Sequence, residues 1–310
     1  MNSKTLLYIL KRLALAVLTV WIVITVTFFV TRAVPGGPFM SEKALSAEAE
    51  AALKAKYGLD KPVFEQYTTY LKDIVTRLDF GPSLKNRGRT VMEIISEGMA
   101  VSVKLGLIAA GCATAIGIVL GAVAALRRNK IVDKVIMVIT TAFVSMPSFI
   151  MGTLFLLIFV EKLQWVGAAT SAEKGGLVLP IITLSLYPAA YITRLTRSSM
   201  LDVLGQDYIR TARAKGLSDN KVHYKHALRN VLSYMITMVS GTITVNLGGA
   251  TVLEKVFNVE GVGLLSYSSL FGKDYPQEQA ILIFFGAIFV FMNIFLDIVY
   301  KILDPRIELD

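Results

Sequence analysis

The side chains best able to do chemistry gather in one basic stretch, residues 208–230, which reads YIRTARAKGLSDNKVHYKHALRN. His223 and His226 are three residues apart, so they would share one face of a helix and could hold a metal ion together. A stable site needs further ligands, and no third one lies nearby in the sequence. The spacing therefore favours two histidines on a solvated helix face.

Motifs for enzymatic chemistry are absent from the sequence. It contains no GxxxxGK[ST] phosphate-binding loop, no HExxH and no G-x-S-x-G, and Cys112 is its single cysteine. Glu254 and Asp297 lie at the ends of apolar stretches, whereas proton relays and cation sites need carboxylates inside them. We therefore expect a protein that is not an enzyme, that binds no metal, cofactor or nucleic acid, and that is not an ion-driven pump.

The elements that must position the basic stretch are apolar helices. The chain is 54% hydrophobic and 18% charged, with a mean hydropathy of +0.60. A bilayer core needs about 20 apolar helical residues, and six uncharged stretches are long enough. They are residues 13–31, 105–126, 135–160, 175–193, 230–253 and 279–296. The pattern predicts an all-α integral membrane protein with six transmembrane helices and both termini on one side.

The charge distribution predicts the orientation of these helices. The side with the termini holds 17 Lys and Arg against 8 Asp and Glu, whereas the other side holds 15 of each. The two short loops on that other side, 161–174 and 254–278, contain lysines alone as basic residues. By the positive-inside rule, both termini and the loop 194–229 face the cytoplasm.

The first connection, residues 33–98, is a long extracytoplasmic segment. It should hold one helix that starts at Ser46 and stops at Gly58, and a second that Pro62 opens. The second helix carries an apolar stripe made of Val63, Phe64, Tyr67, Leu71, Ile74, Val75 and Leu78. This stripe could pack on the outer ends of the spans, lie in the headgroup layer, or dock an external partner. We expect residues 1–98 to form one part and 99–310 a five-helix core.

Small residues and prolines mark the interior of the predicted spans. Ala113, Gly117, Gly121 and Ala125 recur every four residues, which permits close helix–helix packing in lipid. Pro147 lies near the middle of the third span and Pro188 late in the fourth, and each should free backbone carbonyls from the helix.

The loop 194–229 should fold as a short helix, a glycine corner and a second helix that leads into the fifth span. Asp207 stands in the first turn and Lys215 in the last, Gly216 supplies a left-handed stop, and Ser218 caps the second helix. The exposed face should carry Tyr208, Ile209, Arg210, Ala212 and Arg213, residue types suited to insertion into a partner's cleft. The alternative is a basic loop attracted to anionic lipid.

This segment resembles the EAA loop of importer-type ABC permeases, whose consensus is Glu-Ala-Ala, three residues and Gly. Arg210, Thr211 and Ala212 occupy the first three places, and Gly216 the last. The departure at Arg210 removes the acidic group of the consensus, but QDYIRTARAKGLS and HALRN are similar to the version in the peptide branch.

Nearly the whole chain resembles the oligopeptide, dipeptide and nickel family of these permeases. The segments PGGPF, GLDKPVFEQYTTYL, DFGPSLKNRGRTVMEII and DPRIELD are similar to the first membrane subunit of the oligopeptide permease pair. Gly37 favours oligopeptides, because dipeptide and nickel relatives more often have an aspartate there. Dipeptide, glutathione and nickel-complex import stay as alternatives, and a self-contained secondary transporter or channel is the alternative from another class.

The resemblance implies a type I ABC importer permease fold in a bacterial or archaeal plasma membrane. It implies a second permease subunit, two cytoplasmic ATPase subunits that use ATP and Mg, and an extracytoplasmic peptide-binding protein. The residues it assigns to ATPase coupling are Asp207, Tyr208, Ile209, Arg210, Thr211, Ala212, Arg213, Ala214, Lys215 and Gly216.

A path for peptides should be lined by polar groups that bind weakly enough to release their cargo. Ser145, Ser148, Asn246 and Asn293 are the candidates for such a lining. Each of them could instead make a hydrogen bond between helices.

Overall fold

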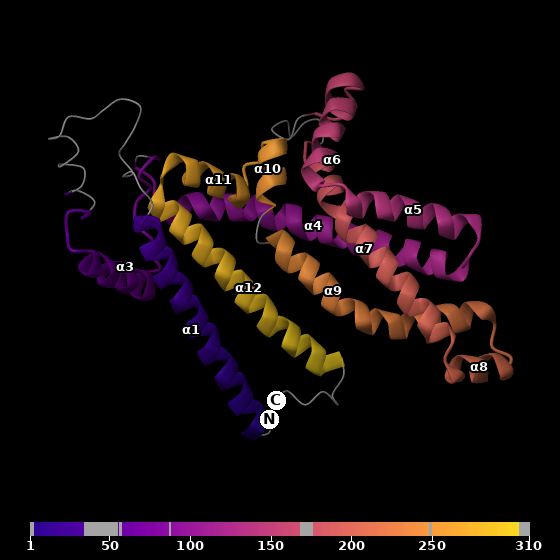
Figure 1. Ribbon diagram of the computed structural model, residues 1–310. Coiled ribbons are helices and arrows are strands. Elements are labelled where there is room, and N and C mark those ends of the chain that lie inside the picture. Colours follow the sequence, from indigo (N-terminus) through magenta and orange to yellow (C-terminus); the bar gives the residue numbers. More distant parts are fainter. Residues whose placement is uncertain are drawn as a thin grey trace. The chain divides into compact units, whose positions relative to one another are not determined.

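The computed structural model describes residues 3–33, 55, 58–86, 88–167, 176–247 and 250–303 (Figure 1). The described chain is helical apart from connecting segments and one isolated antiparallel bridge between Pro82 and Thr90. Its contacts form two compact units. The terminal unit comprises residues 1–101, 260–301 and 306–310, and the central unit comprises 102–259 and 302–305.

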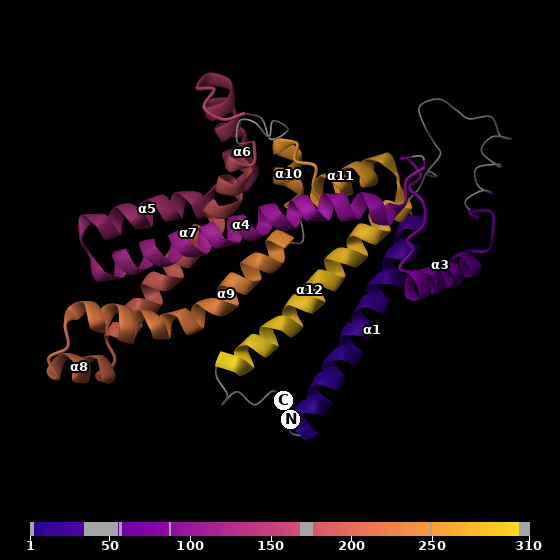
Figure 2. The same cartoon turned by 180° about the vertical axis from the view of Figure 1, so that it is seen from behind.

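The terminal unit is built on two long helices, α1 (Ser3–Ala33) and α12 (Tyr275–Leu303). They lie side by side and run in opposite directions (Figure 1, Figure 2). A Cβ atom on Gly286 would lie 3.4 Å from both methyl groups of Val23, which is ordinary contact. Around them pack α3 (Val63–Arg77), the first turns of α4 (Val91–Leu126) and α11 (Val262–Gly272).

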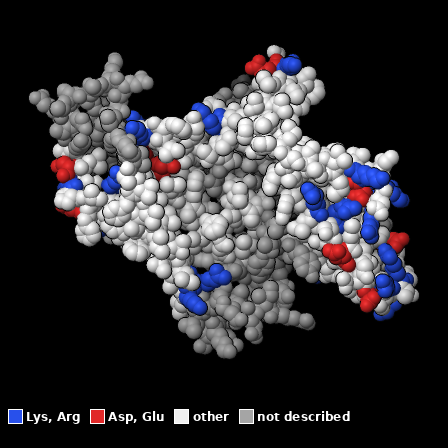
Figure 3. All heavy atoms as spheres, viewed as in Figure 1, with Lys and Arg blue, Asp and Glu red and all other residues white. Residues whose placement is uncertain are grey.

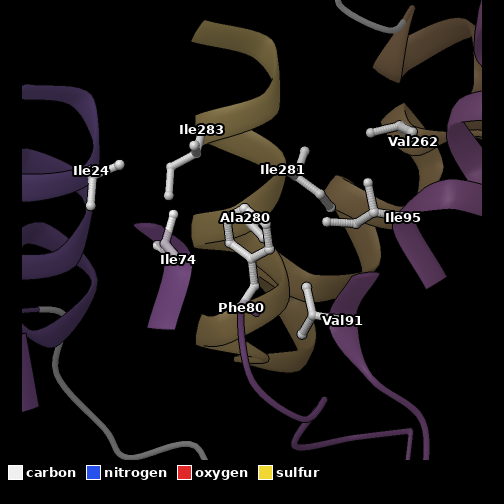
Figure 4. Close-up of a cluster of buried hydrophobic side chains, with 9 residues drawn as sticks. All are labelled: Ile24, Ile74, Phe80, Val91, Ile95, Val262, Ala280, Ile281 and Ile283. Carbon is white, nitrogen blue, oxygen red and sulfur yellow. The ribbon is translucent and has the colours of Figure 1, made fainter. Parts of the chain in front are cut away.

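A hydrophobic core joins these elements of the terminal unit (Figure 4). Its buried side chains come from segments far apart in the sequence: Ile24, Ile74, Phe80, Val91, Ile95, Val262, Ala280, Ile281 and Ile283. The burial of their apolar surface holds the N-terminal helix against the C-terminal one.

Polar contacts pin the segment before α4 to the connection between α11 and α12. The carboxylate of Asp274, itself buried, accepts hydrogen bonds from the Ser83 hydroxyl and from the N–H groups of Leu84 (3.1 Å) and Lys85 (3.3 Å). Nearby, the side-chain amide of Gln279 donates to the Thr31 hydroxyl. A buried carboxylate is tolerated only when it is hydrogen-bonded, so Asp274 needs these donors. The bonds hold the segment before α4 in place.

The helix α3 begins after Pro62, as predicted. Tyr67 and Ile74 of its apolar stripe are buried, whereas Phe64, Val75 and Leu78 are exposed. Leu78 ends the helix with φ of 52°, a left-handed conformation that is unusual for this residue type. The helix expected from Ser46 lies almost wholly outside the described residues, but its predicted stop, Gly58, has φ of +63°.

The central unit contains the remainder of α4 together with α5 (Ile131–Ser145), α6 (Ser148–Phe155), α7 (Val178–Leu204) and α9 (Arg229–Leu247). Shorter elements complete it: η1 (Leu156–Lys162), α8 (Asp207–Ala214), η3 (Lys221–Leu228) and α10 (Thr251–Phe257). The elements η1 and η3 are wound more widely than an α-helix.

The two prolines predicted to disturb spans behave differently. Pro147 separates α5 from α6 at a bend of 102°. Pro188 lies inside α7, which continues past it, so the hydrogen bond that this proline removes does not break the helix. The neighbouring Ala189 and Ala190 are buried, and packing against adjacent helices lets a helix tolerate the hydrogen bond that proline removes.

The small-residue stripe of α4 makes the close helix packing that was predicted, and the helix it packs on is α7. A Cβ atom on Gly117 would lie 2.6 Å from the Ile192 side chain, and one on Gly121 would lie 2.5 Å from Thr196. These separations are shorter than van der Waals contact, so only glycine allows the two helices to approach this closely.

Within the described residues, four helices are long and apolar enough to cross a membrane: residues 10–33, 91–126, 178–204 and 275–296. The bent pair of α5 with α6 and η1 supplies a fifth if it counts as one span. The predicted fifth span, 230–253, corresponds to α9 and the start of α10 and is not among these candidates. A total of six spans therefore stays a prediction.

Candidate functional site

The candidate site is the short helix α8 with the corner that follows it. Gln206 precedes it with extended backbone, and Asp207 lies in its first turn. The helix stops at Gly216, where φ is +77°, and the N–H of Leu217 donates to the Ala212 carbonyl (3.3 Å). The predicted helix and its left-handed glycine stop are thus both present.

The face that α8 exposes differs from the prediction. Ile209 and Ala212 were expected on the exposed face, but their exposed fractions are 0% and 7%. They pack into a core with residues from other helices: Ala125, Met200, Val203, Val222, Ala227, Val231 and Met235. A helix this short is not stable by itself, so its apolar pair at i and i+3 must be buried against the bundle.

The residues that remain outward form a mostly basic surface, which we call the α8 surface. Figure 3 shows Lys and Arg gathered over the part of the central unit that holds α8 and the start of α5. The exposed members on α8 and its corner are Asp207, Tyr208, Arg210, Thr211, Arg213, Ala214, Lys215 and Gly216.

The ion pairs on this surface are weak. Arg210 lies 3.4 Å from Asp207, and Arg213 lies 4.0 Å from Asp219, with all four side chains well exposed. Exposed pairs of this kind contribute little, about 0–1 kcal/mol. Both guanidinium groups can therefore turn to a partner at small cost.

Tyr208 is oriented by a contact with the fifth predicted span. Its hydroxyl accepts a hydrogen bond from the Asn230 side-chain amide (3.0 Å), which also donates to the His226 carbonyl (2.9 Å). This links the start of α8 to the beginning of α9.

The second helix of the loop begins where the sequence predicted. The N–H of Val222 donates to the Ser218 carbonyl (3.1 Å), and η3 then leads directly into α9. His223 and His226 are half-buried on η3 rather than on a fully solvated face. Since Met200 and Val203 belong to α7 and Val231 and Met235 to α9, α8 is mounted on both long helices.

An ion pair that the sequence reading missed joins α5 to α7. The Arg197 guanidinium binds Asp133 with two contacts of 2.6 and 2.8 Å, and the Asn129 N–H also donates to this carboxylate (2.9 Å). The Asp133 side chain is 4% exposed, so the pair is specific in geometry and largely desolvated. A lone acid among Arg127, Arg128 and Lys130 was the signal that could have indicated it.

The four candidate path residues lie in different settings. Ser145 and Ser148 are exposed and flank the bend at Pro147. Asn246 is buried and donates to the Gly106 carbonyl (3.5 Å), which matches the alternative of a contact between helices. Asn293 is exposed on α12 and donates to the Phe289 carbonyl of its own helix (2.7 Å).

Comparison with known proteins identifies the family. Residues 117–309 match the model of the binding-protein-dependent transport system inner membrane component, and residues 5–89 match that of its N-terminal region. The chain belongs to this family. It is therefore a multi-pass membrane protein of the ABC permease type, as the resemblance in the sequence implied.

Relatives of this permease align with almost its full length. It is 41% identical to the dipeptide transport system permease protein DppB of Bacillus subtilis, over 97% of this chain and 98% of the relative. It is 38% identical to the oligopeptide transport system permease protein OppB of Haemophilus influenzae, over 97% of this chain and 99% of that relative.

A solved structure shares the fold of the permease. A chain of the MetNI methionine ABC transporter, in an inward-facing conformation, superimposes with a TM-score of 0.58 at 16% identity. The match covers 69% of this chain and 97% of the other. The fold is thus that of an ABC importer permease.

Proposed function

We propose that this chain is a membrane-spanning subunit of an ATP-driven peptide importer. The observation that carries the proposal is the alignment, over nearly the whole chain, with relatives named as dipeptide and oligopeptide permeases. In this role it forms half of the translocation path beside a second permease subunit. Two cytoplasmic ATPase subunits hydrolyse ATP with Mg, and an extracytoplasmic binding protein delivers the peptide.

The coupling to ATP hydrolysis runs through residues 206–216. The α8 surface seats in a groove of an ATPase subunit, while Ile209 and Ala212 hold the helix to its own bundle. Because those two side chains pack on α7 and α9, a displacement of α8 is passed to both long helices. This arrangement supports a rigid connection between the ATPase subunits and the membrane helices.

The basic character of the α8 surface has a consequence for its partner. Arg210 stands where the importer consensus has a glutamate, so the groove that receives it should present acceptors or acidic groups at that position. We infer that Arg210 and Arg213 exchange their weak intramolecular pairs for contacts with the ATPase subunit.

The substrate class is peptides, with oligopeptides as the first candidate. The preference for oligopeptides rests on Gly37, which lies outside the described residues. The dipeptide permease is 41% identical and the oligopeptide permease 38%, so dipeptides stay as the second candidate, ahead of glutathione and nickel complexes. Competition between labelled dipeptides and longer peptides for uptake into proteoliposomes separates the first two.

The experiment that tests the whole assignment is purification of the tagged chain from its native membrane in mild detergent. A second permease subunit and ATPase subunits should copurify, and peptide-loaded binding protein should stimulate ATP hydrolysis by the complex. A chain that purifies alone and moves solute in liposomes without ATP would instead be a self-contained transporter or channel, and the proposal would be wrong.

A further inference from the structure

The amphipathic helix α3 has an apolar stripe that the fold covers only in part. Tyr67 and Ile74 are buried in the terminal unit, but the exposed fractions of Phe64, Val75 and Leu78 are 72%, 73% and 64%. Phe64 and Val75 lie on the same side of the helix, three turns apart, and Leu78 follows its last residue, so these three side chains mark a discontinuous apolar strip along α3. The proposed function as a peptide permease gives this strip no role.

The contacts between α3 and α1 indicate how deep α3 lies relative to the membrane. The Tyr67 hydroxyl is 2.8 Å from the Thr25 hydroxyl, and the Tyr67 ring packs 5.3 Å from that of Phe28. Closer to the end of α1, the Arg32 guanidinium donates two hydrogen bonds of 3.1 Å to the Gln66 amide oxygen. The contacts of α3 therefore cover α1 from Thr25 to Arg32.

This range falls within the apolar part of α1. The apolar span of α1 is residues 10–33, or 24 residues. Its length is about 36 Å at 1.5 Å per residue, against about 30 Å for the hydrocarbon core. A centred span thus crosses the hydrocarbon boundary about two residues before Ala33, and Thr25 lies about 9 Å below that boundary. Interfacial amphipathic helices bury their apolar face by about 5–10 Å, which is the same depth.

The part of α1 next to α3 also exposes apolar side chains. Val26 and Val30 of α1, at the level of these contacts, are 53% and 57% exposed. An apolar medium at this level would cover the exposed strip and the valines of α1 together.

A basic residue borders the strip, as is typical of a membrane-surface helix. Lys72 precedes Val75 by three residues and is exposed, so its ammonium group can reach phosphate while its stem lies along the apolar surface. Arg77 is exposed as well, but it lies on the far side of the helix from Val75, and within the described residues neither cation forms an ion pair. Thr69 and Thr76 lie on the opposite face and are exposed too.

We propose that α3 is an interfacial membrane helix. Its strip of Phe64, Val75 and Leu78 inserts into the leaflet that surrounds the Ala33 end of α1, and Lys72 binds a lipid phosphate. The helix thereby holds the long segment between the first two spans at the membrane surface. The alternative is that a soluble protein covers the strip, and the depth of the α1 contacts argues against it.

The test uses single-cysteine variants of the full-length chain, in a Cys112→Ala background, copurified with its partner subunits. The complexes are reconstituted in liposomes of phosphatidylethanolamine and phosphatidylglycerol, and a nitroxide is attached at one position. Phe64→Cys and Val75→Cys report on the strip, and Thr69→Cys and Thr76→Cys are matched controls from the same helix. Collision rates are measured with oxygen, which concentrates in lipid, and with a water-soluble nickel chelate.

The proposal predicts a ratio of oxygen to nickel collisions several-fold higher at positions 64 and 75 than at 69 and 76. Equal ratios at all four positions would place the helix in water and overturn it. Protection of positions 64 and 75 from both reagents would mean that protein covers the strip, and this result would overturn it as well. All four substitutions are at exposed positions, so loss of folding should not obscure the result.

Discussion

The left-handed corner at Gly216 offers the sharpest test of how α8 acts. Its φ is +77°, and a Cβ atom at this position would meet no heavy atom within 4 Å. The first side-chain atom here would therefore lie in open space, and the effect expected of a substitution is that of the backbone conformation. Gly216→Val isolates that single cause.

The expected cost follows from the conformation alone. A β-branched residue in the left-handed region is strained by about 1–2 kcal/mol. Relief of the strain requires a change in the backbone between α8 and η3, so the orientation of α8 seen here should lose population by about 5- to 30-fold. Peptide transport per ATP hydrolysed should fall, while the amount of protein in the membrane stays near normal.

The assay is peptide uptake and ATP hydrolysis in proteoliposomes that contain the purified complex. Gly216→Asn is the first control, because asparagine tolerates the left-handed region, and it should retain most of the coupling. Gly205→Ala is the second, because Gly205 has φ of −81° and an added Cβ would meet only ordinary contacts. If Gly216→Val couples ATP hydrolysis to uptake as well as the unmodified chain does, the corner does not position α8.

Three further outcomes are expected. Arg213→Glu should weaken association with the ATPase subunits most strongly at low salt, and salt-independent binding in pull-downs would contradict this. Asp133→Asn leaves the Arg197 guanidinium without its carboxylate and should cost about 2–3 kcal/mol, measured as a lower melting temperature in detergent; an unchanged melting temperature would refute this. Gly121→Ala should reduce the yield of folded protein, because its Cβ would lie 2.5 Å from α7, whereas Gly111→Ala meets nothing within 4 Å and should not; equal yields would count against close α4–α7 packing.

Features that depend on near neighbours could be predicted from the sequence. The stop at Gly216, the start of α3 after Pro62 and the break at Pro147 each follow from the backbone preferences of one residue. The apolar stretches follow from the length that a bilayer demands, and the family follows from motifs spread along the whole chain.

Features that depend on distant partners were decided by the tertiary structure. The sequence placed Ile209 and Ala212 on an exposed face, since nothing local says that α7 and α9 supply a core for them. The same limit hid the pairing of Asp133 with Arg197.

The amino-acid sequence by itself determined that this chain is a helical membrane permease with a short basic helix between two long ones. Only the tertiary structure decided which side of α8 is free to meet a partner, and that α3 leaves an apolar strip uncovered beside α1. The physical reason is that burial depends on contacts between residues far apart in the chain, such as Tyr67 with Thr25, and no local pattern specifies them.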